Sequence, residues 1–165
     1  TTPTPTWRRP QEIISTPSYS RRNGSGPSKR RQRANKKKTV DTSDVVRPLT
    51  GDDQAQFERA KVLFAKESII ITTSVILECE WVLRYAYHFK PLKIADAFQA
   101  LFGLSNVKLE EQLVIYDAIE WRKHGLDFAD AIHLAKSRNS ESFVTFDKKL
   151  IKAASKITIF PVFEP

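Results

Sequence analysis

Two carboxylates lie inside an otherwise apolar stretch, GLDFADAIHLA, which covers residues 125–135. Asp127 and Asp130 are three residues apart, so a helix places them near each other on its surface. A charged carboxylate in apolar surroundings loses its hydration and must find a partner. Asp127 fits a helix cap, because Asp is a strong N-cap residue. Asp130 fits either a charge that complements the helix dipole or a ligand in a functional site.

Three further acids stand where predicted strands end or helices begin. Asp41 follows a short apolar lead-in, and Asp147 directly follows the strand pattern SFVTF. Glu78 lies one turn into the helix expected after an apolar, β-branched strand pattern. Sites in open parallel sheets form at the carboxyl ends of the strands. We therefore expect these three acids to meet Asp130 at one edge of the sheet.

Converging carboxylates repel one another and require a cation or raised pKa values. Two unit charges 4 Å apart cost about 4 kcal/mol at an effective dielectric constant near 20. An all-oxygen ligand set suits Mg²⁺ or Mn²⁺ rather than zinc. A carboxylate-held ion of this kind activates water and stabilises a phosphoryl transition state. The acids therefore predict phosphodiester hydrolysis.

Helical and strand patterns alternate from Thr39 onward, and they are the elements that must position these acids. Strands that alternate with helices indicate a parallel sheet covered on both faces, so we predict an α/β fold. Helices are expected over residues 53–66, 73–87, 91–104 and 111–125, from Asp127 onward and after Asp147, and strands over residues 68–72, 106–110, 142–146 and 156–163.

Residues 1–38 differ in composition from the remainder of the chain. They contain 11 of the 27 Lys and Arg residues, one of the 19 acids and five of the nine prolines. The net charge is therefore +10 here and −2 over residues 39–165, which together give the +8 of the chain. We predict that residues 1–38 form a disordered basic arm and residues 39–165 a nuclease domain. The arm fits a solvated tail, a nucleic-acid-binding arm, a targeting peptide or a non-native extension.

A single cysteine, Cys79, excludes an intramolecular disulfide and a cysteine-based zinc site. This usage fits a reducing compartment, and we expect a cytoplasmic location. The most apolar run, near residues 69–72, is too short to span a bilayer, so no membrane partner is expected.

Several residues near the acids are interpreted as structural. One of Glu78 and Glu80 is expected to be solvated or paired with Arg84, four residues after Glu80. A lone His on an apolar helix, His133, is expected to be a satisfied core residue. Trp81 and Trp121 are interpreted as core residues rather than base-stacking platforms. Turn or cap positions are assigned to Asp44, Asp52 and Asp53.

Four segments match one family in order and spacing: VDTS (40–43), VILECEWVLR (75–84), GLDFADAIHLA (125–135) and FVTFD (143–147). Together they resemble the PIN-domain ribonucleases, and specifically the VapC-type toxins of bacterial toxin–antitoxin pairs. RPLTGDD (47–53) is similar to the family's loop after its first helix. The resemblance covers nearly all of residues 39–165 and none of the arm.

The resemblance implies a small three-layer α/β/α sandwich with a mainly parallel sheet. It also implies acids that coordinate Mg²⁺ or Mn²⁺ for RNA cleavage. By motif position, Asp41, Glu78 and Asp130 are expected to hold the metal. Asp147 is expected to help through water or a second ion.

The same resemblance assigns supporting residues and partners. Ser43 is expected to orient toward the metal-site water or a carboxylate, and Thr145 to support Asp147. Such toxins usually form dimers, so we expect a homodimer with RNA as substrate. A cognate antitoxin typically inserts an Arg or another side chain into the acidic pocket, because that pocket attracts a guanidinium as it attracts Mg²⁺.

Three features near Asp41 depart from the family pattern. Lysines precede Val40 where several apolar strand residues are usual, Asp44 replaces an apolar residue, and Pro48 interrupts the following turn. Either Asp44 changes the metal site, or this end of the domain is altered and activity is impaired. The leading hypothesis is a metal-dependent endoribonuclease toxin. The alternatives are a catalytically impaired PIN-fold module that binds antitoxin or nucleic acid, and a DNA-directed nuclease, which the small size disfavours.

Overall fold

The computed structural model describes residues 36–158 and 160–165. The arm predicted for residues 1–38 therefore lies outside the described residues, except for its last three lysines. Lys38 belongs to the first strand, and its Nζ lies 2.9 Å from Glu67 Oε1. A basic residue near the start of the described residues thus pairs with the domain.

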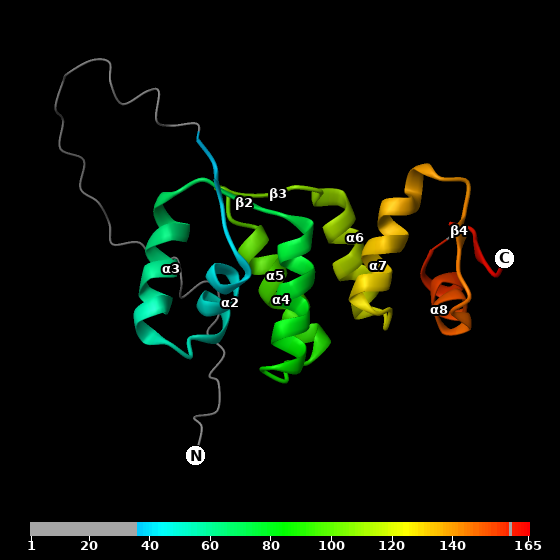
Figure 1. Cartoon of the computed structure of the whole chain (residues 1–165), viewed down its shortest axis with the longest axis horizontal. Coiled ribbons are helices and arrows are strands. Elements are labelled where there is room, and N and C mark those ends of the chain that lie inside the picture. The colour runs from blue at the N-terminus through cyan, green and yellow to red at the C-terminus, as the bar shows by residue number, and fades with distance from the viewer. Residues whose placement is uncertain (1–35, 159) are drawn as a thin grey trace.

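Helices and parallel strands alternate along the described chain, which confirms the predicted α/β class and is consistent with a three-layer sandwich (Figure 1). The strands are β1 (Lys38–Thr39), β2 (Ile69–Ile71), β3 (Val107–Leu109), β4 (Phe143–Val144) and β5 (Val162–Phe163). The helices are α2 (Thr42–Thr50), α3 (Gln54–Lys66), α4 (Thr73–Tyr85), α5 (Pro91–Phe102), α6 (Gln112–Lys123), α7 (Phe128–Lys136) and α8 (Lys148–Ile157), with a 3₁₀ turn η1 (Ser137–Asn139) after α7.

The described strands form two parallel sheets. One sheet has the order β1–β2–β3, and the other pairs β4 with β5. In Figure 1, α8 and β4 lie at the end of the molecule opposite α3. The parallel pairing is as predicted, but the expectation of one shared sheet edge is wrong, because β4 pairs with β5 in a second sheet and not with β1, β2 or β3.

Local signals place most helix ends. Pro91 occupies the first turn of α5 and Gly103 its C-cap, as the sequence predicts. Gly51 ends α2 with a φ of 63°, a conformation that glycine adopts without steric cost. Pro48 lies inside α2, so the loop expected from residue 47 begins only after Thr50. Burial of the apolar face of α2 stabilises this helix despite the missing N–H of the proline.

The core lies between the three-stranded sheet and the helices α2 and α4–α7. Ile69 and Ile71, on one face of β2, are fully buried, and Ile70 on the opposite face is partly buried. Asn106, just before β3, donates from Nδ2 to the carbonyls of Phe64 at 2.7 Å and Glu67 at 2.6 Å. This side chain satisfies the last carbonyls of α3 and fixes that helix to the sheet. Within the described ranges, none of the helices has both the length and the apolar character of a membrane span.

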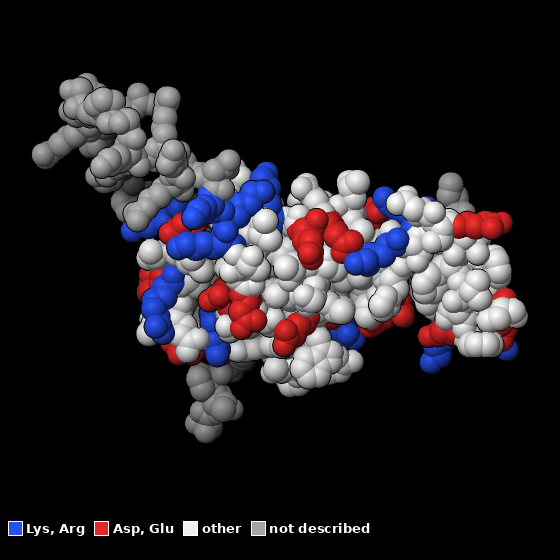
Figure 2. Space-filling view, turned by 45° about the horizontal axis from the view of Figure 1, so that its top comes forward, with Lys and Arg blue, Asp and Glu red and all other residues white. Residues whose placement is uncertain are grey.

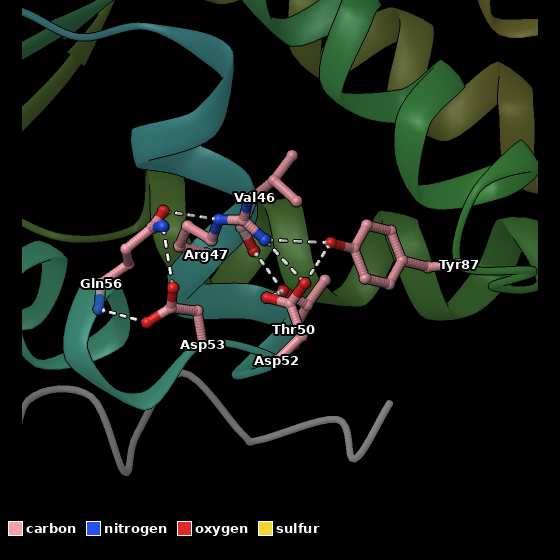
Figure 3. A network of polar contacts seen from close by, with 7 residues as sticks. All are labelled: Val46, Arg47, Thr50, Asp52, Asp53, Gln56 and Tyr87. Atoms are coloured by element: carbon pink, nitrogen blue, oxygen red, sulfur yellow. Dashed lines mark hydrogen bonds and ion pairs between the residues drawn. The ribbon is translucent and has the colours of Figure 1, made fainter. Parts of the chain in front are cut away.

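A polar network joins the α2–α3 turn to the end of α4 (Figure 3). Asp52 Oδ2 accepts hydrogen bonds from Arg47 Nη1 and from the Tyr87 hydroxyl, each at 2.6 Å. Its Oδ1 accepts from the Thr50 hydroxyl at 3.0 Å. Burial raises the pKa of Asp52, but the hydrogen bonds from Tyr87, Arg47 and Thr50 outweigh it and leave the pKa below its usual range. Asp52 is thus the turn residue that the sequence predicts, with a long-range partner in Tyr87.

Replacing Asp52 by Ala should lower the free energy of unfolding by about 1–3 kcal/mol at neutral pH, because three donors lose their acceptor. The folded-state pKa of Asp52 is depressed, so its contribution is present above the ordinary pKa of 3.8 and is lost as the pH falls through the folded-state value. Urea unfolding at neutral and acidic pH tests this, with Asp96→Ala on the exposed surface of α5 as control. An Asp52→Ala effect that does not shrink in acid would contradict the assignment.

Candidate active site

Asp41 and Glu78 are brought together by the start of α2. Asp41 directly follows β1 and Val40, and it is the N-cap residue of α2. The next residue, Thr42, is 8% exposed, and its hydroxyl donates to Glu78 Oε2 on α4 at 2.7 Å. This hydrogen bond joins Thr42 to Glu78, 36 residues later in the chain, and so brings the start of α2 beside α4. The two carboxylates are themselves exposed to solvent.

The negative charges of Asp41 and Glu78 affect the pKa of the Cys79 thiol. Burial is the main cause of its raised pKa, and the charges of Glu78 and Asp41 add to the effect. Cys79 is fully buried, and its Sγ lies 3.7 Å from the carbonyl oxygen of Thr42. The thiol is thus kept protonated, which suits a packing residue and not a nucleophile.

Asp130 and Asp147 form the second pair. Asp130 lies in the first turn of α7 and is partly buried. Burial is the main cause of its raised pKa, followed by the charges of Asp127 and Asp147, while His133 acts in the opposite direction. Asp147 therefore lies within electrostatic range of Asp130, although the two residues belong to different parts of the fold.

Asp147 is fixed by the backbone around it. Its Oδ1 accepts from the N–H groups of Lys149 at 2.8 Å and Leu150 at 3.1 Å, which makes it the N-cap of α8. The Thr145 hydroxyl accepts from the N–H of Asp147 at 3.1 Å. Thr145 thus contacts Asp147 through its backbone and not through its carboxylate. The second oxygen of Asp147 is not used by these contacts.

Ser43 is an exposed residue in the first turn of α2, two residues after Asp41. It lines a cavity of about 320 Å³ between α2 and α3, together with Asp44, Arg47 and Arg59. None of the four predicted ligands lines this cavity. The orientation of Ser43 toward the metal-site water or a carboxylate therefore stays a prediction.

The four acids do not form one cluster in the described part of the chain. There, no group of three or more His, Cys, Asp or Glu residues lies close enough to hold a metal ion. On the face drawn in Figure 2, Asp and Glu side chains form several separate patches. The split between the sheets accounts for this, because Asp41 follows β1 and Asp147 follows β4. The acids stand as two pairs, and their role as ligands stays a prediction.

Glu80, two residues after Glu78, has a different environment. Its carboxylate is almost completely buried, with Oε2 lying 3.1 Å from Arg84 Nη2 and Oε1 3.3 Å from Arg122 Nε. Burial raises its pKa, and the two guanidinium groups oppose that shift. Arg84 Nη1 also lies 3.3 Å from Asp127 Oδ2. Glu80 is therefore a structural acid, as its spacing to Arg84 predicts, and it links α4, α6 and the start of α7.

Four further predictions near the site are tested by contacts and exposure. Asp127 caps α7, since its Oδ1 accepts from the N–H of Ala129 at 3.0 Å. Trp121 packs against the core, as predicted. His133 is exposed and Trp81 is 57% exposed, so both core assignments are wrong. The apolar neighbours of these two residues in sequence face the core instead.

Two contacts were not found by sequence reasoning. The first is the contact from Thr42 to Glu78. Its one signal in the sequence is that Thr42, a residue with a hydroxyl, directly follows Asp41 in the segment VDTS. Arg122 carries no local signal, because its partner Glu80 is on another helix. Both contacts depend on the packing of α2 and α6 against α4.

Comparison with known proteins gives one family. The family model described as PIN domain matches residues 38–156, a span that contains all four predicted ligands. No curated protein and no solved structure gives a significant match.

The raised pKa of Asp130 predicts a stabilising substitution. Its folded-state pKa lies above the ordinary 3.8, so the favourable effect of the neutral form is present below 3.8 and is lost as the pH rises through the folded-state value. At neutral pH in EDTA, Asp130→Asn should therefore unfold at a higher temperature than the wild type. The gain should vanish in acid, where the wild-type carboxyl is also neutral. Asp96→Asn is the surface control, and a destabilised Asp130→Asn at neutral pH would refute the repulsion.

Proposed function

The chain belongs to the PIN-domain family, and from this premise we propose that it is a metal-dependent endoribonuclease, the toxin of a VapC-type toxin–antitoxin pair. PIN domains are nuclease-type folds that typically use divalent metals. The observation that carries the proposal is that the matched span, residues 38–156, contains Asp41, Glu78, Asp130 and Asp147 in the order of the family's acidic motifs.

The charge balance of these acids supports the proposal. Structural carboxylates such as Glu80, Asp52 and Asp127 are paired with arginines. In contrast, no Lys or Arg ion pair is found for the four predicted ligands within the described residues. Burial and the charges of Asp127 and Asp147 raise the pKa of Asp130, and a carboxylate in such surroundings favours a cation.

A divalent cation fits this donor set by its chemistry, because the side chains supply only oxygen atoms. The candidate ligands are Asp41 with Glu78 and Asp130 with Asp147, two pairs that the described residues do not bring into one cluster. When bound, Mg²⁺ or Mn²⁺ supplies positive charge to a phosphate and lowers the pKa of a water molecule. The choice between these two ions is part of the proposal.

The remaining residues position the carboxylates. The Thr42 hydroxyl holds Oε2 of Glu78, and Oε1 takes no part in this hydrogen bond. The first turn of α8 holds one oxygen of Asp147, and Thr145 fixes the backbone from which that side chain extends. Positioning of this kind keeps acidic side chains ready for a ligand, despite their mutual repulsion.

The proposal includes a homodimer, a cytoplasmic location and a cognate antitoxin. An antitoxin arginine is suited to the carboxylate pairs by charge and by its forked donors. Large exposed apolar side chains such as Leu92, at 59% exposure, and Leu113, at 73%, supply surface for protein contacts. RNA is the proposed substrate.

A second candidate is a PIN-fold binding module without efficient catalysis. The observation that favours it is the separation of the four acids into two pairs in the described residues. Such a module would bind antitoxin or nucleic acid and would not turn over. Measurement of turnover separates it from the nuclease.

Cleavage of a mixed RNA panel by the full chain tests the proposed function. We expect cutting in Mg²⁺ or Mn²⁺ and none in EDTA. Asp130→Asn and Asp147→Asn should each reduce the rate by about 100-fold or more, because ligands contribute at least as much as their supporting shell. Asp96→Asn, an exposed acid on α5, should leave the rate unchanged. Metal-independent cutting, or full turnover by Asp130→Asn, would refute the assignment.

The contact from Thr42 to Glu78 makes a separate prediction. Thr42→Val keeps the shape of a buried side chain but removes the hydroxyl that holds Glu78. We expect roughly 10-fold slower cleavage, with little change in the far-UV circular dichroism spectrum. Thr42→Ser should restore most of the rate, since Ser retains the donor. Equal rates for the Val and Ser variants would show that the hydroxyl has no positioning role.

A further inference from the structure

Two large aromatic side chains project from α4 into solvent. Trp81 is 57% exposed and Tyr85 is 54% exposed. Their ring centroids lie 5.5 Å apart with the planes inclined at 44°. Neither ring belongs to the core, so packing within the domain does not account for them.

These rings lie on the same face of α4 as a predicted ligand. Glu78 precedes Trp81 by three residues and Tyr85 by seven, which is about one and two helical turns. All three line one cavity of about 500 Å³, which also contacts Asp127 and Ala129 at the start of α7. The aromatic surface is thus continuous with the side of Glu78 and opens beside α7.

Arg84 makes this surface rigid. Its guanidinium carbon lies 4.6 Å from the centre of the Tyr85 ring, and Nη1 lies 3.4 Å from the Tyr85 hydroxyl. The same guanidinium is bound to Glu80 and Asp127. The arginine charge is therefore already balanced by protein carboxylates and is not free for a phosphate.

The side chains that line the cavity carry a net negative charge and also supply apolar surface. Glu78, Glu80 and Asp127 outnumber the single cation, Arg84, among the side chains that line it. Such a surface disfavours direct binding of a phosphate group, whereas a neutral, planar group stacks on exposed aromatic rings regardless of local charge. On the face drawn in Figure 2, Lys and Arg side chains gather toward the end of the molecule that carries α3, away from its centre.

We infer that Trp81 and Tyr85 form a stacking subsite for an unpaired nucleobase of single-stranded RNA, in the nucleotide next to the cleaved bond. This inference rests on the proposed ribonuclease function and adds a substrate-positioning surface to it. The base must be unpaired, because a base within a duplex has no free face to stack. Stacking is tolerant of base identity, so the subsite selects single strands and not a sequence.

Binding of a fluorescent RNA of about eight nucleotides to the full chain in EDTA tests the inference directly. A pool of the same RNA with one abasic residue, placed at a different position in each member, is the second probe. We expect Trp81→Leu to weaken binding of the intact RNA about tenfold, and Trp81→Phe to restore most of it. Tyr85→Leu is the second variant, and Val62→Ala, at an exposed apolar residue on α3, is the matched control. The abasic RNA that lacks the stacked base should bind the wild type and Trp81→Leu equally weakly.

Steady-state cleavage separates this inference from the proposed function. Stacking on a base away from the reacting atoms contributes equally to ground state and transition state, so Trp81→Leu should raise KM about tenfold with little change in kcat. RNA binding that depends on Trp81, without cleavage in any metal, would refute the proposed nuclease function and support the stacking subsite. Turnover with an unchanged KM in both aromatic variants would overturn the subsite alone.

Two further outcomes overturn the inference. One is the absence of RNA binding by the wild-type chain to either probe. The other is unchanged RNA affinity in Trp81→Leu together with loss of self-association in sedimentation, which would assign the aromatic face to a second copy of the chain.

Discussion

The arrangement of the helices depends on one buried carboxylate, Glu80. A buried charge is stable only when partners replace its lost hydration, and Arg84 and Arg122 do so from α4 and α6. Because Arg84 also reaches Asp127, the cap of α7, this group of charges sets three helices relative to one another. Removing Arg84 would leave the almost completely buried Glu80 with Arg122 as its remaining cation. The positions of Glu78 and of the start of α7 therefore follow from a neighbour that takes no part in the proposed chemistry.

The proposed ligands show the opposite electrostatics. Burial raises the pKa of Asp130, and the charges of Asp127 and Asp147 raise it further, so the folded chain does not neutralise this acid from its own side chains. Repulsion between these like charges offsets part of the free energy gained on folding. This pattern is expected at a site that binds a cation. The short contacts of Thr42 and of the first turn of α8 hold two of the acids against this repulsion. The structural acids and the proposed ligands are thus distinguished by their partners and not by residue type.

Sequence reasoning succeeded where the governing interaction is local. Pro91 and Asp127 mark helix starts, and the spacing of four residues identifies Glu80 with Arg84 as a pair. It failed where packing between distant segments decides. The exposure of Trp81 cannot be read from an apolar helix pattern, because the neighbouring helices determine which face is covered. The separation of β4 from β1 has the same origin, since strand patterns give the direction of a strand but not its neighbour. The ordered acidic motifs identified the family, yet they did not give the distances between the acids.

The short first strand explains the unusual acid near Asp41. Only two residues form β1, because lysines stand where apolar side chains would extend a buried strand, so the sheet gives Asp41 little support. The N–H of Asp41 instead donates to Asp44 Oδ2 at 3.2 Å, across the first turn of α2. This reciprocal placement of N-cap and third helical residue is that of a capping box. Asp44 therefore holds the backbone of the first predicted ligand with one of its own oxygens. Asp44, the acid that departs from the family pattern, thus gives the backbone of Asp41 a contact that the short strand β1 does not supply.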